Sequence, residues 1–463
     1  MGVFGAMITA VSGLQAQSFA LENISGNIAN SQTTGFKRVD SQFVDLVTEA
    51  PARQSRSGST LAFSRATNTI QGDLQTTGIG TNVALNGQGY FVVGERIGTN
   101  GDTPVFNDQT LYTRRGDFVL DKNGYLINGA GYYLKGATID PQTGTTVTAS
   151  TDLIKIPATQ LSARQTTSVT LTANLPSTPQ TNFYKTSTGA AQSELLQPST
   201  FTTNPVTAGT VSADDTQDFL NQSSAAGSMT IYNDIGAPVN VQMRWVKVSD
   251  PQYLPDPTFG SADATWQLFY QSDSKATGTG VAWTRLGADF TFEASGKLKT
   301  PATSMVTSNV TVNGVPVNNV DFNFPNLTQF SDVNGQITNA TIRQNGYSAG
   351  ELQSVSVGAD GRISGTYSNG QIAPLAQIAV VQFQADDALK RREGGVFEQT
   401  LESGQPVLGL QGSKLVGGAL ENSNTDIADE FSKMIITQQA YSANTRVITT
   451  AQQMLQDTIN IIR

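Results

Sequence analysis

The chain has 463 residues, of which 38% are hydrophobic and 44 are glycine, and it contains no histidine and no cysteine. Without these two residue types there is no histidine general base, thiol nucleophile, disulfide or ordinary zinc site, so the chain is poorly equipped for catalysis. The net charge of −9 argues against nucleic acid or an anionic membrane as the main partner, and no apolar run approaches the roughly 18 residues of a membrane-spanning helix.

The first element that the sequence predicts is an amphipathic helix over about residues 3–30. Its apolar residues recur at three- and four-residue spacing, which gathers them into one stripe. The stripe consists of Phe4, Met7, Ile8, Val11, Leu14, Leu21, Ile24 and Ile28. Polar turn formers and a glycine end the pattern at residues 30–35. Residues 1–7 carry no basic segment and the helix is not uniformly apolar, so no cleavable signal peptide is expected.

The long middle of the chain is predicted to be β-structure. The length of the whole chain favours about two to four domains. The abundance of Gly, Thr, Ser, Asn and Gln is typical of a turn-rich β protein, with disorder of the central region as a less favoured alternative. Residues 42–68 show no sustained period and are predicted to be an extended or irregular connector. A hairpin is predicted over residues 118–127 because Asn123-Gly124 suits the positive φ angles of a type I′ turn.

Further strands are predicted from alternating apolar residues. The alternation is clean at residues 169, 171, 173 and 175, whereas residues 178–222 are rich in Thr, Ser, Pro and Gln and are predicted to be long loops. Alternation returns at residues 239–245, 266–270 and 290–292 and again from residue 355 to residue 383.

A second amphipathic helix is predicted at the C-terminus, with N-cap residues between Ser423 and Asp426. Its apolar residues recur every seventh position, with further apolar neighbours beside them. The set consists of Ile427, Phe431, Met434, Ile435, Tyr441, Ile448, Leu455, Ile459 and Ile462. A seven-residue repeat of this length places one apolar seam along the helix, as in coiled coils.

Each seam needs a partner, because such a helix is stable in water only when its stripe is buried. The partner is the other terminus, neighbouring copies of the chain, or both. An ordinary helical hairpin within a monomer is the alternative to assembly. Polar residues along the seams, such as Ser18, Ser25 and Thr445, favour close packing in a crowded assembly.

No motif in the chain indicates catalysis or cofactor binding. The spacing of Gly87, Gly89 and Gly94 fits neither a P-loop nor a dinucleotide fingerprint, so these glycines are interpreted as turn residues. Acidic residues are scattered at ordinary surface density. The basic cluster of residues 390–392 is predicted to be a solvated turn, with an ion pair between subunits as the alternative. We therefore predict no catalytic residue, no cofactor and no metal site.

Several blocks resemble the flagellar axial proteins of bacteria, which form the rod, the hook and the hook-associated parts. The N-terminal signature lies within residues 23–37 (NISGNIANSQTTGFK), and the rod and hook branch is resembled by ALNGQGYFVV, YTRRGDFVLDKNGYLINGAGYYLKG and the C-terminal block from residue 420. The stretches TSVTLTANLPS, SMTIYNDIGAPVNV and QNGYSAGELQSVSVGADGRISGTYSNGQ are similar to the hook branch. The signature residues carried over are Asn27, Ala29, Asn30, Thr34, Gly35, Phe36 and Lys37.

The resemblance implies an α+β fold with paired, coiled-coil-like terminal helices and mainly-β inner and outer domains, the outer inserted into the inner. The expected parts are an axial helical domain (1–30 and 424–463), a connector (31–69 and 416–423), an inner β domain (70–163 and 346–415) and an outer β domain (164–345). The outer domain is long enough for two subdomains. Some hook proteins use a cysteine for cross-links between subunits, and this chain has none.

The resemblance also implies a function. The chain is expected to be a non-enzymatic hook subunit that polymerises into a curved hollow tube, a universal joint between motor and filament. It implies export through the flagellar type III apparatus to an extracellular location. The implied partners are further copies of the chain, the hook cap, the distal rod and the hook-filament junction proteins. A distal rod or junction protein is the nearest alternative, and a secreted adhesin or enzyme is a more distant one.

Overall fold

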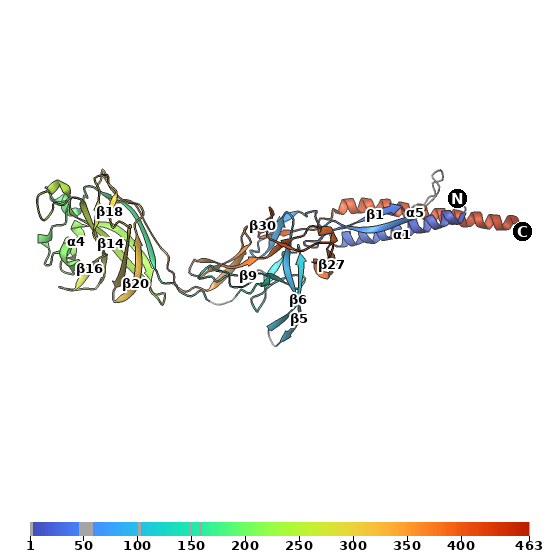
Figure 1. The fold of residues 1–463 in the computed structure, drawn as a ribbon, viewed down its shortest axis with the longest axis horizontal. Helices are drawn as coiled ribbons and strands as arrows, with labels where there is room; N and C mark the ends of the chain where they lie inside the picture. The colour runs from blue at the N-terminus through green and yellow to red at the C-terminus, as the bar shows by residue number, and fades with distance from the viewer. Residues whose placement is uncertain (1–2, 46–58, 101–102, 149–150, 157–159, 463) are drawn as a thin grey trace. The chain divides into compact units, whose positions relative to one another are not determined.

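A computed structural model describes residues 3–45, 59–100, 103–148, 151–156 and 160–462 of the chain (Figure 1). The protein combines long helices at its two ends with mainly β-structure between them, so it has the mixed helix and strand content expected from the sequence. The chain divides into two compact units. Unit 1 comprises residues 1–159, 352–367 and 372–463, and unit 2 comprises residues 160–351 and 368–371.

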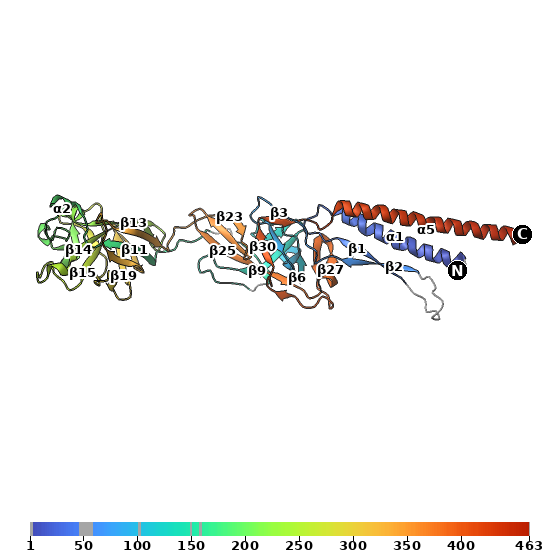
Figure 2. The same cartoon turned by 90° about the horizontal axis from the view of Figure 1, so that it is seen from above.

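The two terminal helices, α1 (Val3–Ala29) and α5 (Ile427–Ile462), lie side by side and run in opposite directions (Figures 1 and 2). At Gly13 the helices come so close that a Cβ atom would lie 2.9 Å from Asn444 Nδ2. The 36 residues of α5 exceed the 27 residues of α1, and α5 extends beyond the N-terminal end of α1 (Figure 2). The last turns of α5 therefore have no part of α1 beside them.

Asp426 directly precedes α5 and caps it, which confirms the predicted N-cap. Its Oδ1 atom accepts hydrogen bonds from the backbone N–H groups of Ala428 (2.8 Å) and Asp429 (3.3 Å). These N–H groups have no acceptor within the helix itself, so the cap satisfies them. Asp429 and Glu430 lie in the first turn, where the helix dipole favours negative charge.

The connector predicted to be extended or irregular is extended over much of its described length, because two strands form there. Strands β1 (Val39–Asp45) and β2 (Thr60–Ala66) pair in antiparallel register from Val39↔Ala66 to Asp45↔Thr60. Residues 46–58 lie outside the described residues. The strands lack an alternating pattern because most of their side chains are exposed or half-buried, so no single face had to be apolar.

The body of unit 1 is an antiparallel sheet to which the described residues contribute 13 strands. The main path runs β23 (Leu352–Val357), β24 (Arg362–Tyr367), β25 (Ile372–Ile378), β9 (Tyr132–Thr138), β5 (Tyr90–Asn100), β6 (Thr103–Thr113), β28 (Val396–Glu398) and β27 (Lys390–Arg392). Shorter strands beside this path are β7 (Phe118–Leu120), β8 (Leu126–Asn128), β10 (Asp152–Leu153), β26 (Val380–Gln382) and β29 (Val407–Leu408). Strands from before residue 139 and after residue 351 thus share one sheet.

The described residues of unit 1 also form two smaller strand pairs and two short helices. The pairs are β3 (Leu74–Thr76) with β31 (Ala419–Glu421) and β4 (Val83–Asn86) with β30 (Lys414–Gly417), and the 3₁₀ helices are η3 (Asp386–Ala388) and η4 (Glu393–Gly395). Buried aromatic rings pack edge to face beside the sheet, with centroids 5.3 Å apart for Tyr90 and Phe397 and 4.8 Å for Tyr112 and Phe383. The two strand pairs join the segment before α5 to strands that follow α1 in the sequence.

The predicted hairpin between β7 and β8 is confirmed, but its turn type differs. Among the positive φ angles of the described residues, Gly124 has +85° and Asn123 is absent, whereas a type I′ turn needs both. Instead, Asp121 Oδ1 accepts hydrogen bonds from the N–H groups of Asn123 (2.9 Å) and Tyr125 (2.7 Å). The side chain of Asp121 therefore stabilises a longer loop, which forms in place of the two-residue turn.

Unit 2 contains two sheets that share one apolar core. The first sheet runs β12 (Thr210–Ser212), β16 (Val281–Arg285), β15 (Ala264–Gln271), β14 (Pro238–Ser249) and β13 (Ser224–Tyr232), with β17 (Phe290–Phe292) and β18 (Leu298–Thr300) beside it. The second runs β19 (Met305–Val312), β20 (Val315–Asn323), β11 (Ser168–Pro176) and β21 (Leu327–Phe330), with β22 (Thr338–Gln344) beside it. The alternation at residues 169–175 is confirmed, because Val169, Leu171, Ala173 and Leu175 are buried.

The prediction of long loops over residues 178–222 is partly wrong. Short helices interrupt this segment, namely α2 (Asn182–Thr186), η1 (Pro198–Thr200), α3 (Pro205–Ala208) and α4 (Thr216–Gln222), and strand β12 lies there too. Helix η2 (Pro251–Tyr253) lies further along the chain. Phe219 is buried against Phe269 and Trp283 of the first sheet, with ring centroids 5.2 and 5.3 Å apart. Each helix is too short to show a helical period, so the sequence pattern could not reveal it.

Removal of most of unit 2 should leave unit 1 folded. The backbone leaves and returns at the same place, because the N–H of Arg164 bonds to the carbonyl of Tyr347 at 2.9 Å and the reverse bond is 3.0 Å. A short Gly/Ser linker in place of residues 165–346 therefore closes the gap at little entropic cost. We expect the shortened chain to keep one cooperative thermal transition by circular dichroism. A broad, non-cooperative melt would show that unit 1 depends on unit 2.

Candidate assembly surface

The buried face of α1 is formed mainly by small residues. The buried residues are Ala10, Ala16, Ala20, Ile24 and Asn27. Of the predicted apolar stripe, Ile24 alone belongs to this face, whereas Met7, Leu14, Leu21 and Ile28 are half-buried. Small side chains allow the close approach of α5 at Gly13, and this spacing of Ala and Gly was the sequence signal that the apolar pattern obscured.

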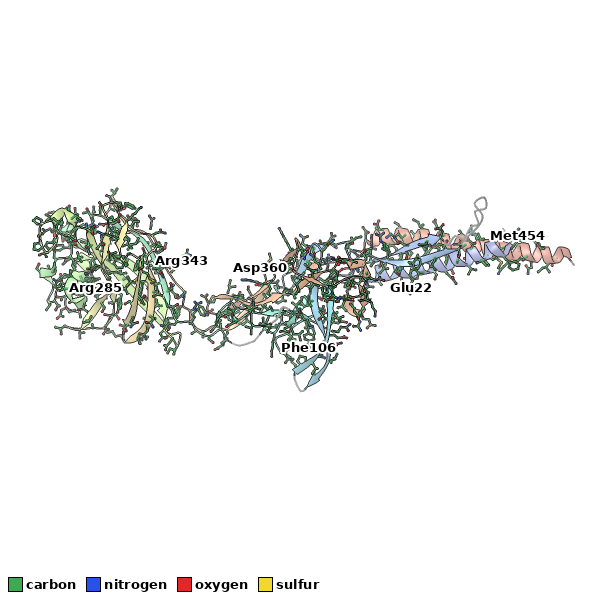
Figure 3. All side chains as sticks on the ribbon, viewed as in Figure 1. Glu22, Phe106, Arg285, Arg343, Asp360 and Met454 are labelled. Carbon is green, nitrogen blue, oxygen red and sulfur yellow. The ribbon has the colours of Figure 1, made fainter. Side chains whose placement is uncertain are left out.

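Large apolar side chains remain exposed on the outer side of α1. Phe4 is 69% exposed, Ile8 is 67% exposed and Val11 is 44% exposed. They follow one another at helical spacing, and Glu22 lies further along the same helix (Figure 3). Exposed apolar side chains that form a contiguous row, in contrast to scattered ones, are typical of an interaction surface.

Helix α5 repeats this arrangement. Its buried residues are Glu430, Thr437 and Ala451, which recur at a spacing that is a multiple of seven. Of the predicted seam, Met434, Ile448 and Leu455 are half-buried, whereas Ile427, Phe431, Ile435, Tyr441 and Ile459 are 40–62% exposed and the side chain of Ile462 lies outside the described residues. Met454, which Figure 3 labels, is 55% exposed. The helix pair therefore buries its small and polar residues internally and leaves many large apolar ones outside.

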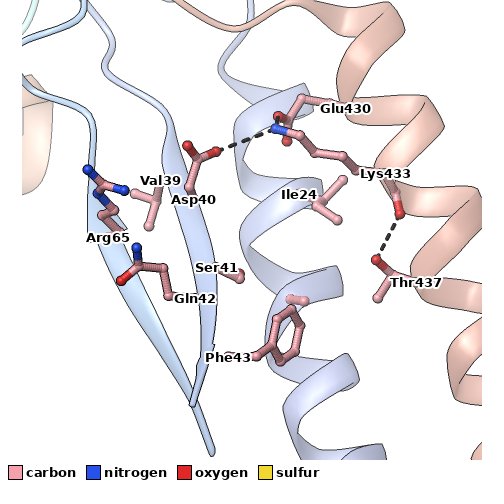
Figure 4. A pocket seen from close by; sticks show the side chains of 11 residues that line it. Ile24, Val39, Asp40, Ser41, Gln42, Phe43, Arg65, Glu430, Lys433 and Thr437 are labelled. Carbon is pink, nitrogen blue, oxygen red and sulfur yellow. Dashed lines mark hydrogen bonds and ion pairs between the residues drawn. The ribbon is translucent and has the colours of Figure 1, made fainter.

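A polar cluster fastens the two helices to strand β1. Asn27 Nδ2 donates hydrogen bonds to Glu430 Oε2 (3.0 Å) and to the carbonyl of Val39 (2.9 Å), whose N–H bonds back to Asn27 Oδ1 at 2.9 Å. Lys433 Nζ lies 2.8 Å from Glu430 Oε1 and 3.4 Å from Asp40 Oδ1 (Figure 4). Burial lowers the pKa of Lys433, but the hydrogen bond and charge of Glu430 with the charge of Asp40 outweigh it, so the net shift is upward.

A groove of about 380 Å³ lies beside this cluster, between α1, β1 and α5 (Figure 4). Its lining is mixed, with Ile24, Val39 and Phe43 supplying apolar surface and Asp40 and Lys433 supplying charge. Three of its charged side chains, Asp40, Glu430 and Lys433, are paired with each other. Chemically, the groove offers a place for packing rather than a catalytic constellation.

The signature segment after α1 carries a second, more deeply buried ion cluster. Lys37 Nζ lies 2.5 Å from Glu421 Oε1, and Arg114 lies 3.3 Å from Glu421 Oε2, with all three side chains at most 2% exposed. Lys37 also donates to the carbonyl of Ile70 at 2.7 Å, and the N–H of Gly72 donates to Glu421 Oε1 at 3.0 Å. Burial lowers the pKa of Lys37, and the charge of Glu421 opposes this shift.

The other signature residues shape the chain around this cluster. Gly35 has a φ of +67°, and a Cβ atom there would lie 2.9 Å from the backbone of Arg114, so glycine is required at this position. The side chain of Asn30 donates to the carbonyl of Gly26 at 2.9 Å and thereby helps to end α1. Thr34 is half-buried and Ala29 is exposed.

The prediction of a solvated turn at residues 390–392 is wrong, because these residues form strand β27. Arg391 turns inward, donates to the carbonyl of Lys37 and lies over the rings of Phe36 (5.3 Å) and Phe397 (5.8 Å). Burial lowers the pKa of Arg391. Lys390 and Arg392 pair with Glu398 of the same chain at 3.6 and 3.7 Å.

No local sequence pattern indicates that Lys37, Arg114, Arg391 and Glu421 come together, because these residues are distant in sequence.

Among the described residues no group of three or more His, Cys, Asp or Glu side chains could hold a metal ion. In the same part of the chain, no helix has the length and apolar character to cross a bilayer.

Comparisons with known proteins identify the family. Family models match at residues 7–37 (flagella basal body rod protein), 84–174 (flagellar hook protein FlgE/F/G D1 domain), 198–347 (flagellar basal body protein FlaE D2 domain) and 416–461 (flagellar basal body rod FlgEFG protein C-terminal). The flagellar hook protein FlgE of Brucella melitensis is 31% identical over the whole of both chains. That of Salmonella typhimurium is 30% identical over 98% of each chain.

A solved structure, that of the Helicobacter pylori flagellar hook protein FlgE2, matches with a TM-score of 0.49 and 18% identity, covering 75% of this chain and all of that one. The identification itself depends on the full-length sequence relatives, which agree with the four matched family models in chain order. On these grounds, the chain belongs to the flagellar hook protein FlgE family.

Proposed function

We propose that this chain assembles with copies of itself into the curved hollow tube of a flagellar hook, which passes torque from motor to filament as a universal joint. The observation that carries the proposal is the exposed apolar surface of the terminal helices, to which Phe4, Ile8 and Phe431 contribute. A soluble monomer gains nothing from this surface, whereas burial between copies removes it from water. The role is structural and needs no catalytic group.

We infer further that the helices form the axial core in a coiled-coil-like pairing and that the outer β domain is nested within the inner one. The seven-residue spacing of buried positions on α5 supports the first inference. The division at residues 160 and 351 supports the second, close to the expected boundaries at 164 and 345. The division does not separate unit 2 into the two subdomains that its length permits.

The remaining partners follow from family membership. We infer end contacts with the hook cap, the distal rod and the hook-filament junction proteins, and export through the flagellar type III apparatus to the outside of the cell. A distal rod or junction protein is disfavoured because the relatives that match the whole chain are named hook proteins. Electron microscopy of the purified chain under polymerising conditions tests the proposal, which requires hollow tubes and fails if none form.

The terminal helices should be poorly protected in the monomer and strongly protected in the tube. Their internal contact buries mainly small and polar residues, which contribute little apolar area, and helices owe most of their stability in water to the packing of an apolar face. Amide hydrogen exchange should therefore be fast over residues 3–29 and 427–462 in the monomer. In the tube the same residues should exchange slowly. Equal protection in both states would contradict burial on assembly.

A further inference from the structure

Among the described residues, seven buried side-chain polar atoms of unit 1 have no hydrogen-bond partner, and four of these seven come from residues that pack in one region. These four are the Tyr90 hydroxyl, Arg114 Nε, Asn68 Oδ1 and Asp386 Oδ1. Their residues are between 0% and 7% exposed, so bulk solvent does not reach them. Buried groups of this kind are almost always paired in native proteins, often through ordered water. Four such atoms in one region therefore require an explanation.

The four residues come from different elements but pack in one region, because the ring of Tyr90 lies 6.0 Å from the ring of Phe383, three residues before Asp386. The guanidinium of Arg114 lies 5.4 Å from the centre of the Tyr90 ring. Asn68 Nδ2 donates to the backbone carbonyl of Asp386 at 2.8 Å. Burial raises the pKa of Tyr90 far above its usual value, and the charge of Asp386 adds to this shift while that of Arg114 opposes it. Both charges thus lie within electrostatic reach of the same hydroxyl.

The chemistry of the four atoms selects the ligand. Arg114 Nε is a donor, the Tyr90 hydroxyl donates or accepts, and the oxygens of Asn68 and Asp386 accept. A metal cation would face Arg114 together with Lys37 and Arg391, and an anion would face the carboxylate of Asp386. Water is neutral and donates and accepts at once, so it matches this mixed set.

We propose that Asn68, Tyr90, Arg114 and Asp386 form a binding site for ordered internal water, which bridges their unpaired atoms. The site adjoins the ion cluster of Lys37, Arg114 and Glu421, because Arg114 belongs to both. Through that cluster the site links the segment after α1, which carries Lys37, to the segment before α5, which carries Glu421. A buried polar network with every group satisfied is rigid and specifies one arrangement. The water thus helps to hold the helices and the sheet of unit 1 in one arrangement. Only the inference that this rigidity serves the transmission of torque rests on the proposed function.

A crystal structure of the full chain, at a resolution that shows ordered water, tests the site directly. We expect a density peak within about 3.2 Å of Arg114 Nε and of at least two of the other three atoms. Direct contacts among the four groups, with no such peak, would overturn the proposal. A peak with the short, regular coordination of a metal ion would overturn it equally. The measurement concerns the monomer, so failure of tube assembly leaves its outcome unaffected.

Tyr90→Phe provides a second test in which a wet and a dry site predict opposite signs. A hydroxyl bonded to internal water stabilises the fold, so its loss should raise the unfolding equilibrium constant of unit 1 roughly two- to tenfold. A dry, unpaired hydroxyl is unfavourable when buried, so its loss would lower that constant or leave it unchanged. Tyr112→Phe is the matched control, because it removes the same group from a ring of the same core outside the site. The proposal fails if Tyr90→Phe stabilises unit 1.

Discussion

Ile8→Asp should abolish tube assembly while the monomer remains folded. Ile8 is 67% exposed on α1, so the new carboxylate is solvated in the monomer and disturbs no core. In the tube we expect this side chain to be buried against a neighbouring copy. Burial of an unpaired charge is strongly unfavourable, and every subunit carries the defect. Sedimentation and electron microscopy measure assembly, and thermal melting measures the integrity of the monomer.

Ile8→Leu is the matched control, since it keeps the apolar volume and should still form tubes. Normal tubes from Ile8→Asp would show that the outer side of α1 faces solvent in the assembly. A monomer that melts much earlier than the parent would instead favour a helical hairpin whose stripe is buried within one chain. Either result would remove the main support for assembly through this face.

Lys37→Met should destabilise unit 1 by about 3–5 kcal/mol, because it leaves Glu421 buried with one of its two cations removed. Lys390→Met is the matched control: the side chain of Lys390 is 67% exposed, so loss of its pair with Glu398 should cost at most about 1 kcal/mol. Equal effects of the two substitutions would show that the buried cluster contributes little.

The two units can be followed separately in the Lys37→Met experiment. All three tryptophans, Trp245, Trp266 and Trp283, belong to unit 2, so tryptophan fluorescence reports that unit alone. Circular dichroism reports both units. We expect the fluorescence transition in urea to keep its midpoint while the circular dichroism transition gains an earlier phase. A shifted fluorescence midpoint would indicate that the two units unfold together.

The sequence predicted those elements whose signals are local. The alternation at residues 169–175, the hairpin around Gly124 and the cap at Asp426 depend on neighbours within a few residues, and the structure contains all three. The pairing of strands β1 and β2 was not predicted, because pairing along their backbones needs no apolar alternation. The short helices of residues 178–222 were missed because each is much shorter than the window of about 11–18 residues over which helical periodicity is recognised.

The candidate site was only partly predictable for a different reason. Heptad spacing located the terminal helices, but it assigned the seam to large apolar residues, whereas the contact between the helices at Gly13 requires small ones. The ion cluster joins Lys37, Arg114 and Glu421, and nothing local relates a lysine to a carboxylate nearly four hundred positions away. Likewise, the basic composition of residues 390–392 predicted a surface turn, and nothing local indicates that Arg391 stacks on Phe36.

The most direct test of assembly through the terminal helices is an electron cryomicroscopy reconstruction of the tube at side-chain resolution. We predict that Phe4, Ile8 and Val11 of α1, together with Phe431 and Ile435 of α5, lie within about 4.5 Å of apolar atoms from neighbouring copies. A tube in which these side chains face water, with contacts between copies confined to the β domains, would contradict the account.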